Sequence, residues 1–100
     1  MSNTIGMTAF TKAMTEARKL EDIADDIRAL VKSKIKNLKV NDLSNWKGES
    51  SIAFLNELEE IEQKMMNEAK NLDSYATTIR QIARKKLELD QSVADILPKL

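Results

Sequence analysis

The chain contains very few residues that interrupt a helix. Among its 100 residues there are two glycines and one proline, and the proline, Pro98, stands almost at the end. Proline stops a helix because it lacks a backbone N–H donor and its ring clashes with the preceding turn. The sequence therefore favours long helices, with one reversal near Gly48, where glycine permits a close turn of the backbone.

Apolar residues in the first half recur at steps of three and four, which is helical spacing rather than the alternation of a strand. They are Ala13, Ala17, Leu20, Ala24, Ile27, Val31, Ile35 and Leu38. Thr8 is a plausible N-cap. Four lysines lie near the far end, where positive charge suits the helix dipole: Lys32, Lys34, Lys36 and Lys39. We expect a helix over about residues 8–40.

The second half repeats this pattern over a longer stretch. Its apolar positions are Leu55, Leu58, Ile61, Met65, Ala69, Leu72, Ala76, Ile79, Ala83 and Leu87. Ser50 or Ser51 is expected to cap the start, and Pro98 to stop the helix. The pattern predicts a turn over about 41–49 and a helix over about 50–97.

A short connection between two long helices favours an antiparallel pair. The expected fold class is therefore all-α, a helix-turn-helix hairpin that forms a single domain over residues 1–100. Folding the chain at Asn45–Trp46 places residue i roughly opposite residue 91 − i. This register brings Lys32, Lys34 and Lys36 near Glu57, Glu59 and Glu60, and Asp22, Asp25 and Asp26 near Lys64 and Lys70.

The composition argues against several classes of function. The chain has no histidine and no cysteine, so we expect no metal site, no cofactor and no enzyme activity. Sixteen basic and sixteen acidic residues cancel, which argues against nucleic-acid binding. The sequence contains no run of about 18 apolar residues, so we expect no membrane span. Its start does not resemble a cleaved signal peptide.

The apolar stripes are wider than the seam of a two-helix hairpin requires. The surplus positions form a candidate dimer face: Phe10, Ile23, Leu30, Phe54, Met66 and Ile82. Small domains of this kind usually need oligomerisation, so we expect a homodimer or heterodimer with another small hairpin, packed as a four-helix bundle. The alternative is a monomer whose exposed face is its binding site.

The end of the second helix forms a candidate recognition tail. In the expected register it has little of its own chain to pack against beyond about Leu87. Apolar residues nevertheless continue there, and an apolar overhang implies a covering partner. The alternative is that Ile5 and Met7 extend the first arm over part of it. The tail comprises Lys86, Leu89, Asp90, Val93, Ile96 and Leu97.

The central segment Trp46-Lys47-Gly48 resembles the turn motif of the WXG (ESAT-like) family of small type VII secretion substrates in bacteria. A small residue and then an aromatic, Phe54, follow it, as in that family. The resemblance implies a dimerising hairpin that moves from the cytoplasm to the outside or the cell surface without a cleaved signal peptide. Export would be driven by a secretion ATPase. Trp46 would plug the end of the hairpin, form part of the surface that the machinery recognises, or do both.

The sequence departs from the family at the tail. Many members carry Tyr-x-x-x-Asp or Tyr-x-x-x-Glu there, whereas this chain has Lys86 four residues before Asp90. The resemblance then implies that a partner supplies the tail signal. That partner is another small hairpin or the helical N-terminal region of a larger LXG-type toxin, for which this chain would be a targeting factor.

Three alternatives to an exported protein stay open. One is a cytosolic adaptor or chaperone for such a toxin, which would not itself be a free effector. Another is a membrane-active amphipathic hairpin without stable membrane insertion. A third is a coiled-coil module with a purely structural role.

Overall fold

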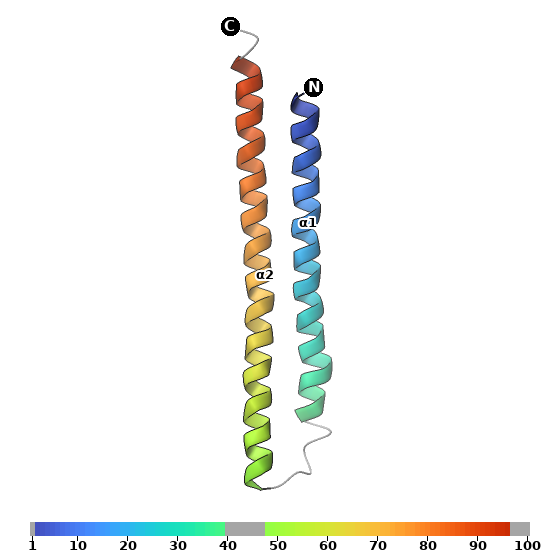
Figure 1. The fold of residues 1–100 in the computed structure, drawn as a ribbon. Helices are drawn as coiled ribbons and strands as arrows, with labels where there is room; N and C mark the ends of the chain where they lie inside the picture. The colour runs from blue at the N-terminus through green and yellow to red at the C-terminus, as the bar shows by residue number, and fades with distance from the viewer. Residues whose placement is uncertain (1, 40–47, 97–100) are drawn as a thin grey trace. The chain divides into compact units, whose positions relative to one another are not determined.

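The computed structural model describes residues 2–39 and 48–96, without the side chains of 2–5, 50 and 93–96. Helix α1 spans Ser2–Leu30 and is followed by a π-helical segment, η1, at Val31–Ile35. Helix α2 spans Glu49–Ile96. The described residues contain no strand, and Figure 1 shows α1 in blue to cyan and α2 in green to red. The predicted all-α class is confirmed.

The chain divides into two compact units, each built from parts of both helices. Unit 1 comprises Met1–Glu21 and Asp73–Leu100, and unit 2 comprises Asp22–Leu72. In unit 1, Gly6 lies beside Leu87 while Glu21 lies beside Arg80, so the two helices run in opposite directions. The antiparallel helical hairpin predicted from the sequence is therefore also confirmed.

Alanine occupies most of the fully buried apolar positions at the helix contacts. Ala17 and Ala76 are completely buried in unit 1, as are Ala24 and Ala69 in unit 2. Val31 and Leu58 are the only larger apolar side chains in the buried class among the described residues. Small residues at a helix contact allow the axes to approach closely, but they remove little apolar surface from water. The fully buried core of the hairpin is therefore narrow, and among the described residues ten large apolar side chains remain exposed.

The expected register is wrong. Glu21 pairs with Arg80, where the sequence register placed it near residue 70, and Lys39 pairs with Glu62 rather than lying near residue 52. Both units thus show the same displacement toward the C-terminus of α2. In each unit the partner lies ten residues further along α2 than the expected register placed it.

The displaced register also changes the expected charge pairs. Lys39 takes Glu59 and Glu62 as partners, and Asp25 pairs with Arg28 on its own helix. These contacts differ from those expected for the lysines at 32–36 and for the aspartates at 22–26. A lysine of the first arm does contact glutamates of the second, as expected, but that lysine is Lys39.

The start of α1 covers more of α2 than expected. Helix α1 begins at Ser2, so Thr8 lies inside the helix and is not its N-cap. Gly6 lies against α2 at Leu87 and Asp90, so the second helix does not lose the cover of its own chain at Leu87. The extension of the first arm, considered above as the alternative, is what the structure shows for this part of the tail.

Gly48 occupies the N-cap position of α2. Its carbonyl oxygen accepts the Ile52 backbone N–H at 3.3 Å and the Ser51 hydroxyl at 2.8 Å. Ser51 is therefore a donor to the carbonyl and not the expected cap, while the Ser50 side chain lies outside the described residues. The φ angle of Gly48 is 109°, a region that side chains with a Cβ atom rarely adopt. The motif glycine thus has a conformational role at the start of α2.

Replacing Gly48 or Gly6 with alanine should change the free energy of unfolding in opposite directions. A Cβ atom on Gly48 would meet nothing within 4 Å, so Gly48→Ala acts through backbone strain and should lower the free energy of unfolding by about 1–2 kcal/mol. A Cβ atom on Gly6 would make ordinary contacts, at 3.5 Å from the Asp90 carboxylate and 3.7 Å from Leu87. Gly6→Ala should therefore raise the free energy of unfolding by up to about 1 kcal/mol, through helix propensity.

Urea unfolding followed by circular dichroism measures both variants against the parent chain. A shift of the two variants in the same direction would contradict the roles assigned to these glycines.

Candidate partner-binding surfaces

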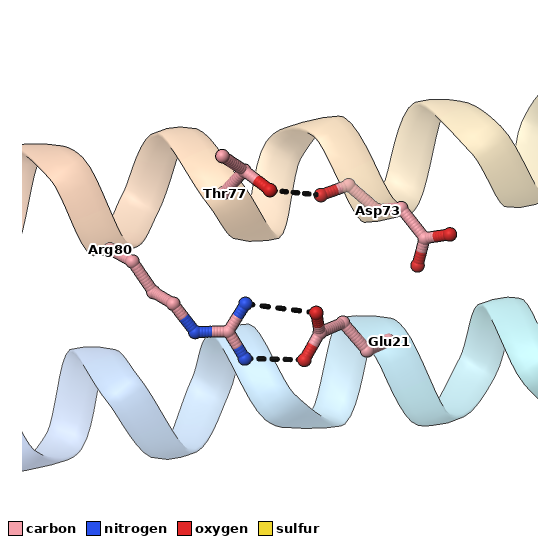
Figure 2. Close-up of polar contacts among 4 residues, drawn as sticks. All are labelled: Glu21, Asp73, Thr77 and Arg80. Atoms are coloured by element: carbon pink, nitrogen blue, oxygen red, sulfur yellow. Dashed lines mark hydrogen bonds and ion pairs between the residues drawn. The ribbon is translucent and has the colours of Figure 1, made fainter.

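An ion pair connects α1 and α2 in unit 1. Arg80 donates from Nη1 to Glu21 Oε2 at 2.9 Å and from Nη2 to Oε1, so the contact is bidentate (Figure 2). Both side chains are partly buried. The hydrogen bond from Arg80 lowers the pKa of Glu21, and the same bond raises the pKa of Arg80. A bidentate pair adds geometric specificity, so this contact helps to define which turn of α1 meets which turn of α2.

Unit 2 has a corresponding contact. The Lys39 ammonium lies 2.7 Å from the Glu62 carboxylate and 4.0 Å from that of Glu59. The hydrogen bond to Glu62 raises the pKa of Lys39. The pair borders an open hollow of about 590 Å³, whose other lining residues are Gln63, Met66 and Asn67. The hollow is polar and open, which differs from the mostly apolar pockets that bind small molecules.

Large apolar side chains lie exposed along α2 in unit 1. Tyr75, Ile82 and Leu89 are spaced seven residues apart and are 57%, 63% and 61% exposed. A seven-residue repeat keeps side chains on one side of a helix, in the pattern that helices use to pack on each other. This row is a candidate binding surface for another helix.

Unit 2 presents a second set of exposed apolar side chains. Ile23 and Leu30 are seven residues apart on α1, and Phe54 and Ile61 are seven residues apart on α2. Met66 is also exposed. Each unit thus leaves apolar side chains uncovered by its own helices.

The structure places the predicted dimer-face residues in two different environments. Five of them are exposed: Ile23, Leu30, Phe54, Met66 and Ile82. Phe10 is half-buried and precedes the buried Ala17 by seven residues, which places it on the contact between the two helices of its own hairpin. Tyr75 was not predicted, although its seven-residue spacing from Ile82 was the signal that could have found it.

The tail residues are only partly described. Lys86 Nζ lies 2.6 Å from Asp90 Oδ1, one helical turn away, and Asp90 is half-buried. Leu89 is exposed. Val93 and Ile96 belong to α2 but their side chains are outside the described part of the chain, and both Leu97 and Trp46 lie outside the described residues.

The described residues offer little for other kinds of site. Among them, no three histidine, cysteine or acidic side chains are grouped so that they could hold a metal ion. No described helix is long and apolar enough to cross a membrane.

The Glu21–Arg80 pair should make the stability of the folded chain depend on pH. Because the pKa of Glu21 lies below its ordinary value of 4.5, the pair's contribution is present above that value and is lost as the pH falls through the folded-state pKa. Glu21→Gln should therefore be less stable than the parent at neutral pH, and the difference should close as the pH approaches about 2.

Thermal unfolding across this pH range measures the difference. Glu16→Gln is the matched control, because Glu16 pairs with Lys19 on its own helix and does not join the two helices. If the difference between Glu21→Gln and the parent does not change with pH, the ion pair has no such role.

Comparison with known proteins assigns the chain to a family. The model of the WXG100 family, described as proteins of 100 residues with WXG, matches residues 7–91. No curated protein and no solved structure matches the chain significantly. The matched region includes Trp46 and Gly48 and most of both helices. The WXG100 family is associated with type VII secretion substrates, and its members typically pair as helical-hairpin dimers. This chain, an antiparallel helical hairpin with Gly48 at the start of its second helix, belongs to the WXG100 family.

Proposed function

We propose that this protein acts by helix–helix association, as a type VII secretion substrate or as a targeting partner for one. It is exported as a folded dimer or together with a larger effector. The observation that carries the proposal is the set of large apolar side chains that each unit leaves exposed, several of them seven residues apart on one helix.

The energetics of the hairpin support association. Fully burying one large apolar side chain is worth roughly 1.5–3 kcal/mol, whereas the alanines at the helix contacts contribute much less. Ile82 and Leu89 remain more than half exposed in the single chain. A second helical hairpin that covered them would add burial that the narrow core does not provide.

The partner is another small helical hairpin or the helical N-terminal region of a larger toxin. Both present amphipathic helices, which is the kind of surface that exposed rows at heptad spacing accommodate. Trp46 and Gly48 would contribute the turn part of the signal that the secretion ATPase complex recognises. The protein would then be made in the cytoplasm and reach the outside or the cell surface by this route.

The Lys86–Asp90 contact favours the targeting-partner form of the proposal. Lys86 stands where many family members have an aromatic residue, and its ammonium group is paired with Asp90. The chain therefore lacks a complete tail signal of the usual form, and the partner would supply it. An adaptor that remains in the cytosol and delivers an LXG-type toxin is the related second candidate.

Export from the native host tests the proposal directly. The chain should be found in the culture medium when the secretion ATPase and the partner are present, and should remain in the cells when the ATPase gene is deleted. Immunoblots of both fractions, with a cytosolic enzyme as lysis control, provide the measurement.

The two forms of the proposal predict different results. If the chain stays in the cells but its deletion blocks export of a toxin, the adaptor form holds. If it stays in the cells and its deletion affects no exported protein, the proposed function is wrong.

Replacing one lysine should make export independent of the partner. Lys86→Tyr places an aromatic residue four positions before Asp90 and removes the ammonium group that pairs with the carboxylate. The variant should be exported from a strain that lacks the partner, whereas the parent chain should not.

Lys85→Tyr is the matched control. Lys85 is the neighbouring lysine and is also exposed, but an aromatic there has Leu89 four positions later. Retention of both variants in the partner-deleted strain would show that the missing aromatic is not what makes export depend on the partner.

A further inference from the structure

The start of α1 is held to α2 by few buried contacts. Among the described side chains, none before Ala17 on α1 and none after Ala76 on α2 is in the buried class. The ion pair between Glu21 and Arg80 lies further along α1, beyond Ala17. Parts of a protein with little buried apolar contact can open at low free energy while the rest stays folded. The start of α1 is therefore the part of unit 1 from which such an opening is expected.

Gly6 weakens this same part of α1, because glycine is a poorer helix former than alanine. The described structure does not require a glycine here. The positive φ among the described glycines belongs to Gly48, and a Cβ atom on Gly6 would make only ordinary contacts with Asp90 and Leu87. The first turn of α1 also contains no acidic residue, which would suit the positive end of the helix dipole. The chain thus forgoes two stabilising features at one end of this helix.

The start of α1 covers the Asp90 side chain of the candidate recognition tail, at the end of α2 (Figure 1). A Cβ atom on Gly6 would lie 3.5 Å from Asp90 Oδ2, and Lys86 Nζ lies 2.6 Å from Asp90 Oδ1. Each carboxylate oxygen therefore has a neighbour within the chain, and the side chain is only 32% exposed. Leu87 is half-buried at the same contact, whereas Leu89 is 61% exposed. A partner that binds this carboxylate has to compete with these contacts.

We propose that the start of α1, up to about Met14, is a lid that opens as one unit while the rest of the hairpin stays folded. Opening gives a partner access to Asp90 and Leu87. The lid regulates the tail in the proposed function, on which this inference rests.

Electrostatics connects partner binding to the lid. In the closed form the Asp90 carboxylate lies beside the first turns of α1, where it supplies the negative charge that the first turn lacks. A partner group that donates hydrogen bonds to Asp90, such as a guanidinium or an ammonium group, takes this charge away from α1. Because such a partner binds only the open form, its apparent affinity is reduced by the fraction of chains that are open.

Hydrogen exchange of single backbone amides, measured by NMR on the purified chain, tests whether the lid moves as one unit. The amides from Thr8 to Met14 should share one opening free energy, well below that of the amides around Ala17 and Ala24. Fraying from the helix end would instead give protection that rises residue by residue, and that result would overturn the proposal.

Two alanine variants separate lid opening from global unfolding. Gly6→Ala should slow exchange of the lid amides by up to about fivefold, because alanine stabilises the closed helix. Asn56→Ala is the matched control, since it also improves helix propensity but at an exposed position of α2 in unit 2. It should leave exchange of the lid amides unchanged. Equal slowing by both variants would show that these amides exchange through global unfolding, and there would then be no lid.

The same variants test the role of the lid in export. Pulse-chase labelling of the native host measures the rate at which the chain, or the toxin that it delivers, appears in the medium. Gly6→Ala should lower this rate by up to about fivefold, because fewer chains are open, and Asn56→Ala should leave it at the parent's value. Export of Gly6→Ala at the parent's rate would overturn the claim that the partner needs an open lid.

The lid and the proposed function fail separately. If export needs the secretion ATPase but protection of the lid amides rises residue by residue, only the lid is wrong. If these amides open together but neither the chain nor a toxin needs the ATPase, only the proposed function is wrong.

Discussion

Alanine occupies most of the fully buried apolar positions between α1 and α2, and the rest of the structure depends on this choice. Ala17, Ala24, Ala69 and Ala76 are completely buried, whereas side chains as large as Tyr75 are more than half exposed. Small side chains allow two helices to pack closely but provide little burial of apolar surface. The hairpin thus leaves a substantial apolar surface facing outward, and helix–helix association is the function that such a surface supports.

Ion pairs between the helices then select one register among those that alanine contacts allow. Alanines spaced seven residues apart look alike after a shift along the helix, so packing alone discriminates weakly between registers. Glu21 with Arg80 in unit 1 and Lys39 with Glu62 in unit 2 report the same displacement. Partly exposed pairs contribute modestly to stability, but mismatched charges in another register would oppose it.

The sequence predicted the helices and the hairpin because helical periodicity and the scarcity of helix breakers are local signals. It did not predict the register, because lysines and glutamates recur along both arms and their order fits more than one alignment. It also grouped the half-buried Phe10 with exposed side chains and left out the exposed Tyr75, since steps of three and four do not separate the inner side of a helix from its outer side. The motif around Trp46 and Gly48 identified the family. The positive φ of Gly48 explains physically why a glycine occupies this position.

The central claim is that a single hairpin is incomplete and that another helical chain covers its exposed rows. Native mass spectrometry of the protein purified from its own host at cellular concentration tests this most directly. We expect a complex of two or more chains that contains this 11.3 kDa chain. A well-folded species of 11.3 kDa alone, with no associated chain, would contradict it.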